Sequence, residues 1–517
     1  MKKRLLNILL VSMLSFSLCA CGDTDTQKTA QTEEGIEQQD TDGKTVPQAK
    51  EESNETAASE ESDATESADE EESALVEEVD LSLFTEPTNA DAFEYEERDG
   101  GTITIEGLTD DSQQVVVIPA QIDGKDVTSI SGEAFSGCSN LRGIVIPDSV
   151  TWIGDNAFED CSSLTNIVMP KDVTSIKKRT FLNCSNLTSI VIPDGVTYIG
   201  ISAFDGCSRM SGIVIPDSVA NIEKAAFADC SNLSAIVVDE NNLSYTSVDG
   251  VLFDKDMKTI IAVPGKMHTY RIPESVTKIA ESAFEGCSSL TSVEIPNSVT
   301  EMGINVFKGC SSLTSVTIPS SLTSISAQTF EDCTSLTSVT IPNSVTDISL
   351  AFKGCSSLTS ITIPDSVTKI RSAFAGCSSL TNVTIPNGVT DISSAFSGCS
   401  SLTSMIIPEG VTKIDNAFQY CSNLTSITIP GSVSEIGKDA FKSCSSLQSV
   451  TIENGVTGIN GYAFAFCDNL TNIIIPESVT AIEKSAFLLC DNLTTITAPA
   501  GSYAESWAKE NGYDVKH

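Results

Sequence analysis

The sequence predicts an α/β solenoid, a stack of about 15 short repeats with one parallel β-sheet face and a cap at each end. Three observations predict it. One pattern, Cys-x-x-Leu-x-x-Ile-x-Ile-Pro-x-x-Val-x-x-Ile followed by Ala-Phe, recurs with steps of mostly 22 or 23 residues. Apolar residues alternate over its Ile-x-Ile part, as in a half-buried strand. A Phe returns at a fixed place, and no repeat can bury its Leu, Ile and Phe without neighbours.

Residues 1–21 are predicted to export and tether the chain. Lys2, Lys3 and Arg4 precede an apolar run that is too short to span a bilayer. The segment ends in Leu18-Cys19-Ala20-Cys21, which resembles the signal of a bacterial lipoprotein, in which Cys21 is lipidated. The alternative is a plain secretory signal with an incidental Cys. We expect an extracytoplasmic protein, lipid-anchored to the bacterial cell membrane and exposed at the cell surface.

The segment after this signal is strongly acidic. Between Gly22 and Asp99 the chain carries 27 acidic and 4 basic residues, many Ser and Thr, and few aromatic residues. This composition buries too little apolar surface to offset the entropy of ordering the chain. We expect a disordered linker that, as a flexible coil, reaches about 45 Å.

Both ends of the repeat array are predicted to be capped. Phe93 and Tyr95 alternate toward Asp99-Gly100-Gly101, which indicates a hairpin over the first open edge. At the other end, Ser502-x-x-Glu505 is a capping box that opens a short helix. The predicted parts are the signal peptide (1–21), the acidic linker (22–92), the N-terminal cap and lead-in repeat (93–137), the repeats (138–498) and the C-terminal cap helix (499–517).

The repeats can be counted by their cysteines. Fifteen are present: Cys138, Cys161, Cys184, Cys207, Cys230, Cys287, Cys310, Cys333, Cys355, Cys377, Cys399, Cys421, Cys444, Cys467 and Cys490. None forms Cys-x-x-Cys and their number is odd, so we expect a buried column of free thiols rather than a metal site, with isolated disulfides left open.

One step, after Cys230, is 57 residues long. It contains two predicted strands, 251–253 and 259–263, in a hairpin-like insertion at about 239–272. Asp254-x-Asp256 does not continue as a calcium loop, so cation binding there is only a weak alternative.

The whole unit, Ala-Phe-x-x-Cys-Ser-Ser-Leu-Thr-Ser-Ile-x-Ile-Pro-x-Ser-Val-Thr-x-Ile, resembles the BspA-like leucine-rich repeat of bacterial surface proteins. The likeness runs from about Phe93 to the end of the chain. It implies a leucine-rich repeat horseshoe or rod. It also implies a surface adhesin that binds host or neighbouring-cell components.

A candidate partner surface lies in the outward column between the paired core residues. Its first five members are all valine: Val145, Val168, Val191, Val214 and Val237. Ordered apolar exposure favours a partner site, although valine is also simply a good strand former. Trp152 and Tyr198 are the only aromatic residues in a second outward column of the same region, and we add them to the candidate surface.

Composition excludes several other functions. The 517 residues include 70 Asp and Glu against 30 Lys and Arg, for a formal net charge of −40. A nucleic-acid partner is not expected, because phosphates must be met by clustered Lys and Arg. The chain has only two histidines, His268 and His517, and no P-loop, G-x-S-x-G or H-E-x-x-H motif. We expect no enzyme and no cofactor.

Two functional hypotheses remain. The first is a membrane-anchored, surface-displayed binding module or adhesin for an unknown protein or glycan of a host or neighbouring cell. The second is a structural scaffold of the producer's own cell envelope. The repeats do not separate the two, because function lies in sites that the fold does not dictate.

Overall fold

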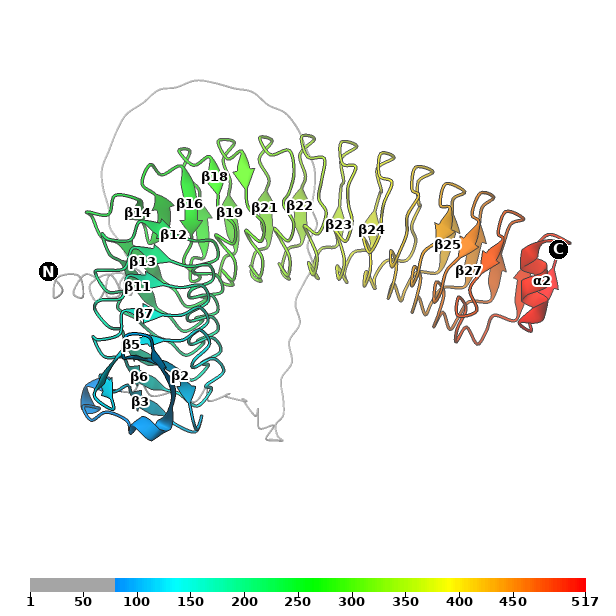
Figure 1. Cartoon of the computed structure of the whole chain (residues 1–517). Helices are drawn as coiled ribbons and strands as arrows, with labels where there is room; N and C mark the ends of the chain where they lie inside the picture. The colour runs from blue at the N-terminus through cyan, green and yellow to red at the C-terminus, as the bar shows by residue number, and fades with distance from the viewer. Residues whose placement is uncertain (1–79) are drawn as a thin grey trace, which may run out of the picture. The chain divides into compact units, whose positions relative to one another are not determined.

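The computed structural model describes residues 80–517, all within one compact unit, Val76–His517. The predicted signal peptide, Cys21 and residues 22–79 of the predicted linker lie outside the described residues. Most repeats contribute two short strands, and stacked repeats pair them into two ladders of mainly parallel strands (Figure 1). We call the ladder of the Ile-x-Ile strands the first ladder and that of the Val-Thr-x-Ile strands the second ladder.

The first ladder runs through the following strands in chain order: β3 (Val115–Val117), β6 (Gly143–Val145), β8 (Asn166–Val168), β11 (Gly212–Ile215), β13 (Ala235–Val238), β17 (Thr269–Arg271), β19 (Ser292–Glu294), β21 (Ser315–Thr317), β22 (Ser338–Thr340), β23 (Ser360–Ile361), β24 (Asn382–Val383), β25 (Ser426–Ile429), β27 (Ser449–Ile452), β29 (Asn472–Ile474), β31 (Thr495–Thr497) and β32 (Asp514–Lys516). Two repeats lack a strand in this ladder, at residues 189–191 and 404–406.

The second ladder is made of shorter strands: β5 (Lys125–Ile130), β7 (Trp152–Ile153), β9 (Ser175–Ile176), β10 (Tyr198–Ile199), β12 (Asn221–Ile222), β16 (Thr259–Ala262), β18 (Lys278–Ile279), β20 (Glu301–Met302), β26 (Glu435–Ile436), β28 (Gly458–Ile459) and β30 (Ala481–Ile482). Between β20 and β26 it is reduced to isolated bridges, Asp347 with Lys369 and Asp391 with Lys413. Asp347 and Lys369 also form an ion pair at 3.3 Å.

The predicted solenoid is confirmed, and it is almost free of helix. Within residues 80–517 the only α-helix is α2 (Tyr503–Glu510), and η1 (Leu81–Leu83) and η2 (Ala90–Ala92) are short 3-10 turns. The segment before each Cys cannot be helical because it holds residues in the left-handed region, such as Asn416 (φ 52°) and Tyr420 (φ 62°). Each repeat therefore closes through tight turns.

Stacked phenylalanines form the centre of the core. Phe441 and Phe464 lie parallel with ring centroids 5.2 Å apart, and most neighbouring repeats show the same arrangement. The C-terminal cap closes the column, because the Trp507 ring lies 5.7 Å from Phe487. Ser502 is the N-cap of α2 and its side chain accepts a hydrogen bond from the Glu505 amide.

The N-terminal cap has two parts. β1 (Phe93–Arg98) and β2 (Thr102–Leu108) form an antiparallel hairpin, and β2 then pairs with β5 of the second ladder. β4 (Gln121–Ile122) is a short antiparallel partner of β5. The chain before the hairpin caps the first ladder, because the Thr88 amide donates to the Val117 carbonyl of β3 at 2.9 Å.

The insertion divides the core in two. Besides the predicted strands, here β15 (Val251–Asp254) and β16, it contains β14 (Tyr245–Val248), which the sequence did not indicate. β14, β15 and β16 pair antiparallel in that order, and β16 continues the second ladder by pairing with β18. Side chains alternate between the two faces of β15, so that Leu252 joins the N-terminal core cluster, whereas Val251 and Phe253 join the C-terminal one.

Candidate functional site

The predicted valine strip is only partly exposed. Val191 is 72% exposed and Val168 is 44% exposed, whereas Val145, Val214 and Val237 are half-buried. Val191 belongs to one of the two repeats without a strand in the first ladder. The exposed part of the strip is therefore centred on Val168 and Val191.

A segment of the chain itself covers the start of the strip. The turn η1 packs against β6 and β8, and the Leu81 side chain is buried there, whereas Leu83 is exposed. Thr88 fastens the same segment to β3 twice, since its hydroxyl also accepts a hydrogen bond from the Val117 amide at 2.9 Å. Residues 80–92 belong to the predicted linker, whose acidic composition predicts disorder, whereas in the structure they contain η1 and η2 and pack on the first ladder.

The structure does not join Trp152 and Tyr198 to the valines. Both lie in the second ladder, Trp152 in β7 and Tyr198 in β10. The turn at the repeat proline separates the second ladder from the first. Trp152 is 46% exposed and lines a hollow of about 380 Å³ together with Arg98 and Thr104. Arg98 is already paired there, with Glu106 at 3.2 Å and Glu96 at 3.3 Å.

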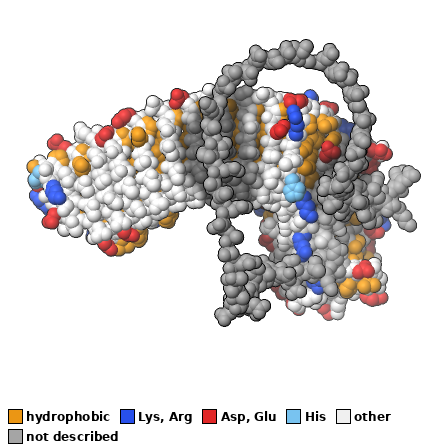
Figure 2. Space-filling view, turned by 180° about the vertical axis from the view of Figure 1, so that it is seen from behind, with side chains coloured by type: hydrophobic (Ala, Val, Ile, Leu, Met, Phe, Trp, Pro, Cys, Tyr) orange, Lys and Arg blue, Asp and Glu red, His pale blue; other side chains and the backbone are white. Residues whose placement is uncertain are grey.

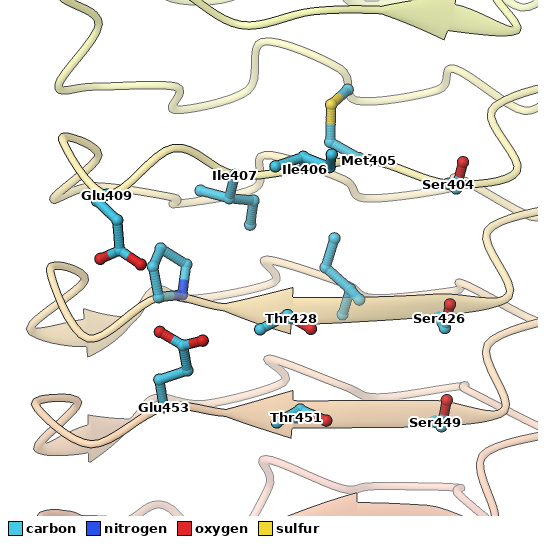
Figure 3. A pocket seen from close by; sticks show the side chains of 12 residues that line it. Ser404, Met405, Ile406, Ile407, Glu409, Ser426, Thr428, Ser449, Thr451 and Glu453 are labelled. Carbon is cyan, nitrogen blue, oxygen red and sulfur yellow. The ribbon is translucent and has the colours of Figure 1, made fainter. Parts of the chain in front are cut away.

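A second hollow, of about 400 Å³, lies over the first ladder near the C-terminal end (Figure 3). We call it the C-terminal hollow. Its lining residues are Ser404, Met405, Ile406, Ile407, Glu409, Ser426, Ile427, Thr428, Pro430, Ser449, Thr451 and Glu453.

The side chains of the C-terminal hollow are arranged by type. Figure 3 shows Ser404, Ser426 and Ser449 in a row at one end, and the carboxylates of Glu409 and Glu453 pointing toward each other at the other end. Ile406 is 85% exposed at this site. Over the C-terminal repeats, Figure 2 shows a mostly uncharged field with Asp and Glu along its borders.

Sequence reasoning missed this hollow, although two signals for it were present. Ile406 interrupts a column that reads Thr340, Thr362, Thr384 before it and Thr428 after it. Glu453 stands where almost all other repeats have the proline that ends the strand.

The repeat cysteines offer no candidate site. All fifteen are free and buried. The Cys161 thiol donates to the Phe135 carbonyl of the preceding repeat at 3.0 Å, and the equivalent bond recurs in most repeats. Within residues 80–517, no group of three or more His, Cys, Asp or Glu is placed to hold a metal ion.

Comparison with known proteins identifies the family of this fold. The model of the BspA type leucine rich repeat region matches residues 115–234, 264–372, 349–425 and 415–507. The chain belongs to this family. Proteins of the BspA type are typically found at the cell surface, and the leucine-rich repeat solenoid is typically a non-catalytic binding scaffold.

Solved leucine-rich repeat structures resemble this BspA-type chain. A leucine rich cell surface protein from Faecalibacterium prausnitzii is 28% identical, with 62% of this chain and 93% of that chain covered and a TM-score of 0.39. A leucine-rich repeat protein from Bacteroides ovatus is 28% identical, with 83% and 99% covered and a TM-score of 0.40. The pneumococcal vaccine antigen PcpA is 19% identical, with 82% and 96% covered and a TM-score of 0.41.

Two further findings concern curated relatives of the chain and helices that could span a membrane. No curated protein matches the chain. Across the described range, 80–517, no helix has the length and apolar character needed to cross a membrane.

Proposed function

We propose that this BspA-type chain is a surface-displayed binding module or adhesin, tethered through a lipid on Cys21, for proteins or glycans of a host or neighbouring cell. The observation that supports it is the outward column of the first ladder, where Val168 is exposed on β8 and Val191 and Ile406 are exposed in the two repeats that lack a strand. The only charged members of this column between Val145 and Thr497, Arg271 and Glu294, pair with each other at 3.5 Å.

Such a column suits recognition for a physical reason. Exposed apolar side chains that are held in place by a stack of repeats lose little conformational entropy when a partner covers them. Ordered apolar patches on a protein surface mark sites of association. The proposed function is therefore non-catalytic binding.

The direct test is binding of the purified chain to a panel of extracellular-matrix proteins, mucins and the producer's own envelope. The informative variant combines Val168→Glu with Val191→Glu, which puts two charges on the exposed strip. Its matched control combines Thr300→Glu with Thr346→Glu, at exposed positions beside the second ladder. Binding to a foreign component that only the valine variant loses, with an unchanged circular dichroism spectrum, supports the proposal.

The alternative function predicts another result. Binding only to the producer's envelope favours a structural scaffold of that envelope. Protease treatment of whole cells tests display separately, because an exposed solenoid is cleaved from intact cells whereas an internal one is protected.

A further inference from the structure

Outward residues of the second ladder form one row near its N-terminal end. Strand pairing sets Thr104 of β2 beside Ser129 of β5, and Ser129 beside Trp152 of β7. β9 packs next to β7 in the stack, and its Ser175 pairs with Tyr198 of β10. Trp152 is 46% exposed and Tyr198 is half-buried. The row therefore presents two aromatic rings to solvent, with a small residue between them.

The distance between the two aromatic rings follows from the stacking of the repeats. Neighbouring strands lie about 4.8 Å apart, so two steps separate Trp152 from Tyr198 by on the order of 10 Å. Each sugar of an extended β-1,4-linked glycan advances by a distance similar to one strand step, and alternate sugars present the same face. The face of an aromatic ring is negative and attracts the weakly positive C–H groups of a sugar ring. A glycan laid along the row thus meets the two aromatic side chains with alternate sugars.

The hollow beside Trp152, which we call the Trp152 hollow, supplies hydroxyl groups. Besides Trp152 and Arg98 it is lined by four hydroxyl residues, Thr104, Thr128, Ser129 and Thr151. In the part of the chain that the structure describes, the hydroxyls of Thr128 and Thr151 have no hydrogen-bond partner, whereas Thr197, at the same position of a later repeat, donates to the preceding repeat at 3.3 Å. A hydroxyl both donates and accepts, as the hydroxyls of a sugar do.

Charges along the row are balanced by the chain itself. The Arg98 guanidinium is paired with two glutamates, at 3.2 and 3.3 Å, and its Nε donates to the Thr104 hydroxyl at 3.0 Å. Burial first, and then the nearby carboxylates of Glu223 and Asp155, raise the pKa of Tyr198. The phenol therefore remains a donor, and the carboxylates beside it are acceptors for ligand hydroxyls. These surroundings suit a ligand that has many hydroxyl groups and no charge.

We infer that the row from Trp152 to Tyr198 binds a neutral, extended, β-1,4-linked glycan. One sugar stacks on Trp152 with its hydroxyls toward Thr128 and Thr151, and the sugar two places along stacks on Tyr198. An acidic glycan is disfavoured, because the chain carries a formal net charge of −40 and repels anions. This inference rests on the proposed binding function and names the ligand class at one site.

The test measures binding of defined oligosaccharides to the full chain by isothermal titration calorimetry, in a detergent without a sugar headgroup. The probe is cellohexaose. Its controls are maltohexaose, which is the same sugar with α-1,4 linkages and a curved shape, and a hexamer of galacturonic acid, which is charged. We expect cellohexaose to bind at least tenfold more tightly than either control. Tryptophan fluorescence should change with it, because of the two tryptophans Trp507 is buried and Trp152 is exposed.

Variants then locate the binding. We expect Trp152→Ala to weaken cellohexaose binding at least tenfold and Tyr198→Ala at least threefold. Thr128→Val with Thr151→Val removes two hydroxyls at nearly constant shape and should weaken it at least threefold. The matched control is Tyr420→Ala, which removes an aromatic side chain that is 52% exposed outside the row, and it should change binding less than twofold. Circular dichroism checks that each variant is folded.

Several outcomes would overturn the inference. Equal binding of cellohexaose and maltohexaose, or a folded Trp152→Ala chain that binds cellohexaose normally, would do so. Tighter binding of the galacturonic acid hexamer would show that Arg98 recognises an anion instead. If no oligosaccharide binds while the chain still binds a panel component, the proposed function stands and the row is not a glycan site. If cellohexaose binds at the row but no panel component binds, the inference stands and the adhesin proposal fails.

Discussion

In most repeats the cysteine thiol donates a hydrogen bond to a backbone carbonyl of the preceding repeat. In the folded chain the Cys399 thiol donates to the Phe374 carbonyl at 3.2 Å, and the side chain is fully buried. Burial raises the pKa of the Cys377 and Cys421 thiols to about 12. A small, apolar side chain with one weak donor suits this position, which explains its repetition.

We therefore expect fourteen of the fifteen repeat thiols to be unreactive in the folded protein at pH 8; the exception is Cys490, because its hydrogen bond with the Cys467 thiol lowers its pKa. The thiolate is the reactive form, and a raised pKa together with burial leaves almost none of it accessible. Iodoacetamide labelling followed by peptide mass spectrometry checks this, with the chain in guanidinium chloride as the control, where all fifteen should react. Fast labelling of several of these cysteines without denaturant would contradict it.

A second residue-scale feature is a group of carboxylates where the two core clusters meet. Burial first, and then the nearby Asp229 carboxylate, raise the pKa of Asp205 to about 7. Glu285 also raises it, whereas Lys308 and a hydrogen bond with Ser202 act in the opposite direction. Lys308 is itself paired with Glu285 at 2.7 Å.

This raised pKa predicts how stability depends on pH. The folded chain holds the Asp205 proton more tightly than the unfolded chain does, so this group's contribution to the free energy of unfolding falls as the pH rises from about 4 to about 7. Asp205→Asn removes that loss and should be more stable than the natural chain by about 1–3 kcal/mol at pH 8, and similar to it near pH 4.

Denaturant unfolding at the two pH values measures this difference. Asp365→Asn, at an exposed position, is the control and should change stability by less than about 0.5 kcal/mol at either pH. A destabilised Asp205→Asn chain at pH 8 would show that the carboxylate makes a favourable contact there.

At the scale of elements, the segment before β1 acts as a strap on the first ladder. Leu81 lies buried against β6 and β8, and Thr88 holds the other end to β3. The strap competes with any partner for Val145 and Val168, because they belong to the strands that it contacts.

Leu81→Asp should release this strap, since it places a charge in an apolar contact. We expect faster proteolysis near residues 80–88 and greater accessibility of Val145 and Val168, with a loss of about 1–3 kcal/mol from the buried Leu side chain. Limited proteolysis and hydrogen exchange of β6 and β8 measure both effects. Leu83→Asp is the matched control, because Leu83 is 76% exposed and its replacement should change neither.

At the scale of the whole molecule, the proposed lipid anchor on Cys21 would determine where the solenoid acts. If Cys21 is lipidated, Cys21→Ser should move the protein from the membrane fraction to the soluble fraction of the cell envelope or to the medium. The reason is that stable membrane attachment requires acyl chains. Immunoblots of the fractions, with Cys19→Ser as the control, measure the shift. An unchanged distribution of the Cys21→Ser protein would contradict lipidation.

Much of the fold could be predicted because the sequence of a single repeat contains the information that determines its local structure. The alternation around Ile427 and Ile429 shows which side chains face inward, and the recurring Phe shows that repeats must stack. The site is different, because it depends on contacts between distant segments. The packing of Leu81 against β6 has no periodic signal in the sequence, and the break in the first ladder at residues 404–406 is marked only by Ile406 in a column of threonines.

We expect the insertion to help set the register of the array during folding. Neighbouring repeats are so similar that a strand displaced by one whole repeat would bury nearly the same side chains. β14 and β15 have no counterpart elsewhere in the repeats, and β16 and β17 leave the insertion as members of the second and first ladders. The insertion is thus a segment that can pair in one register only, within an array of similar repeats. Correct pairing can spread from it in both directions along the chain.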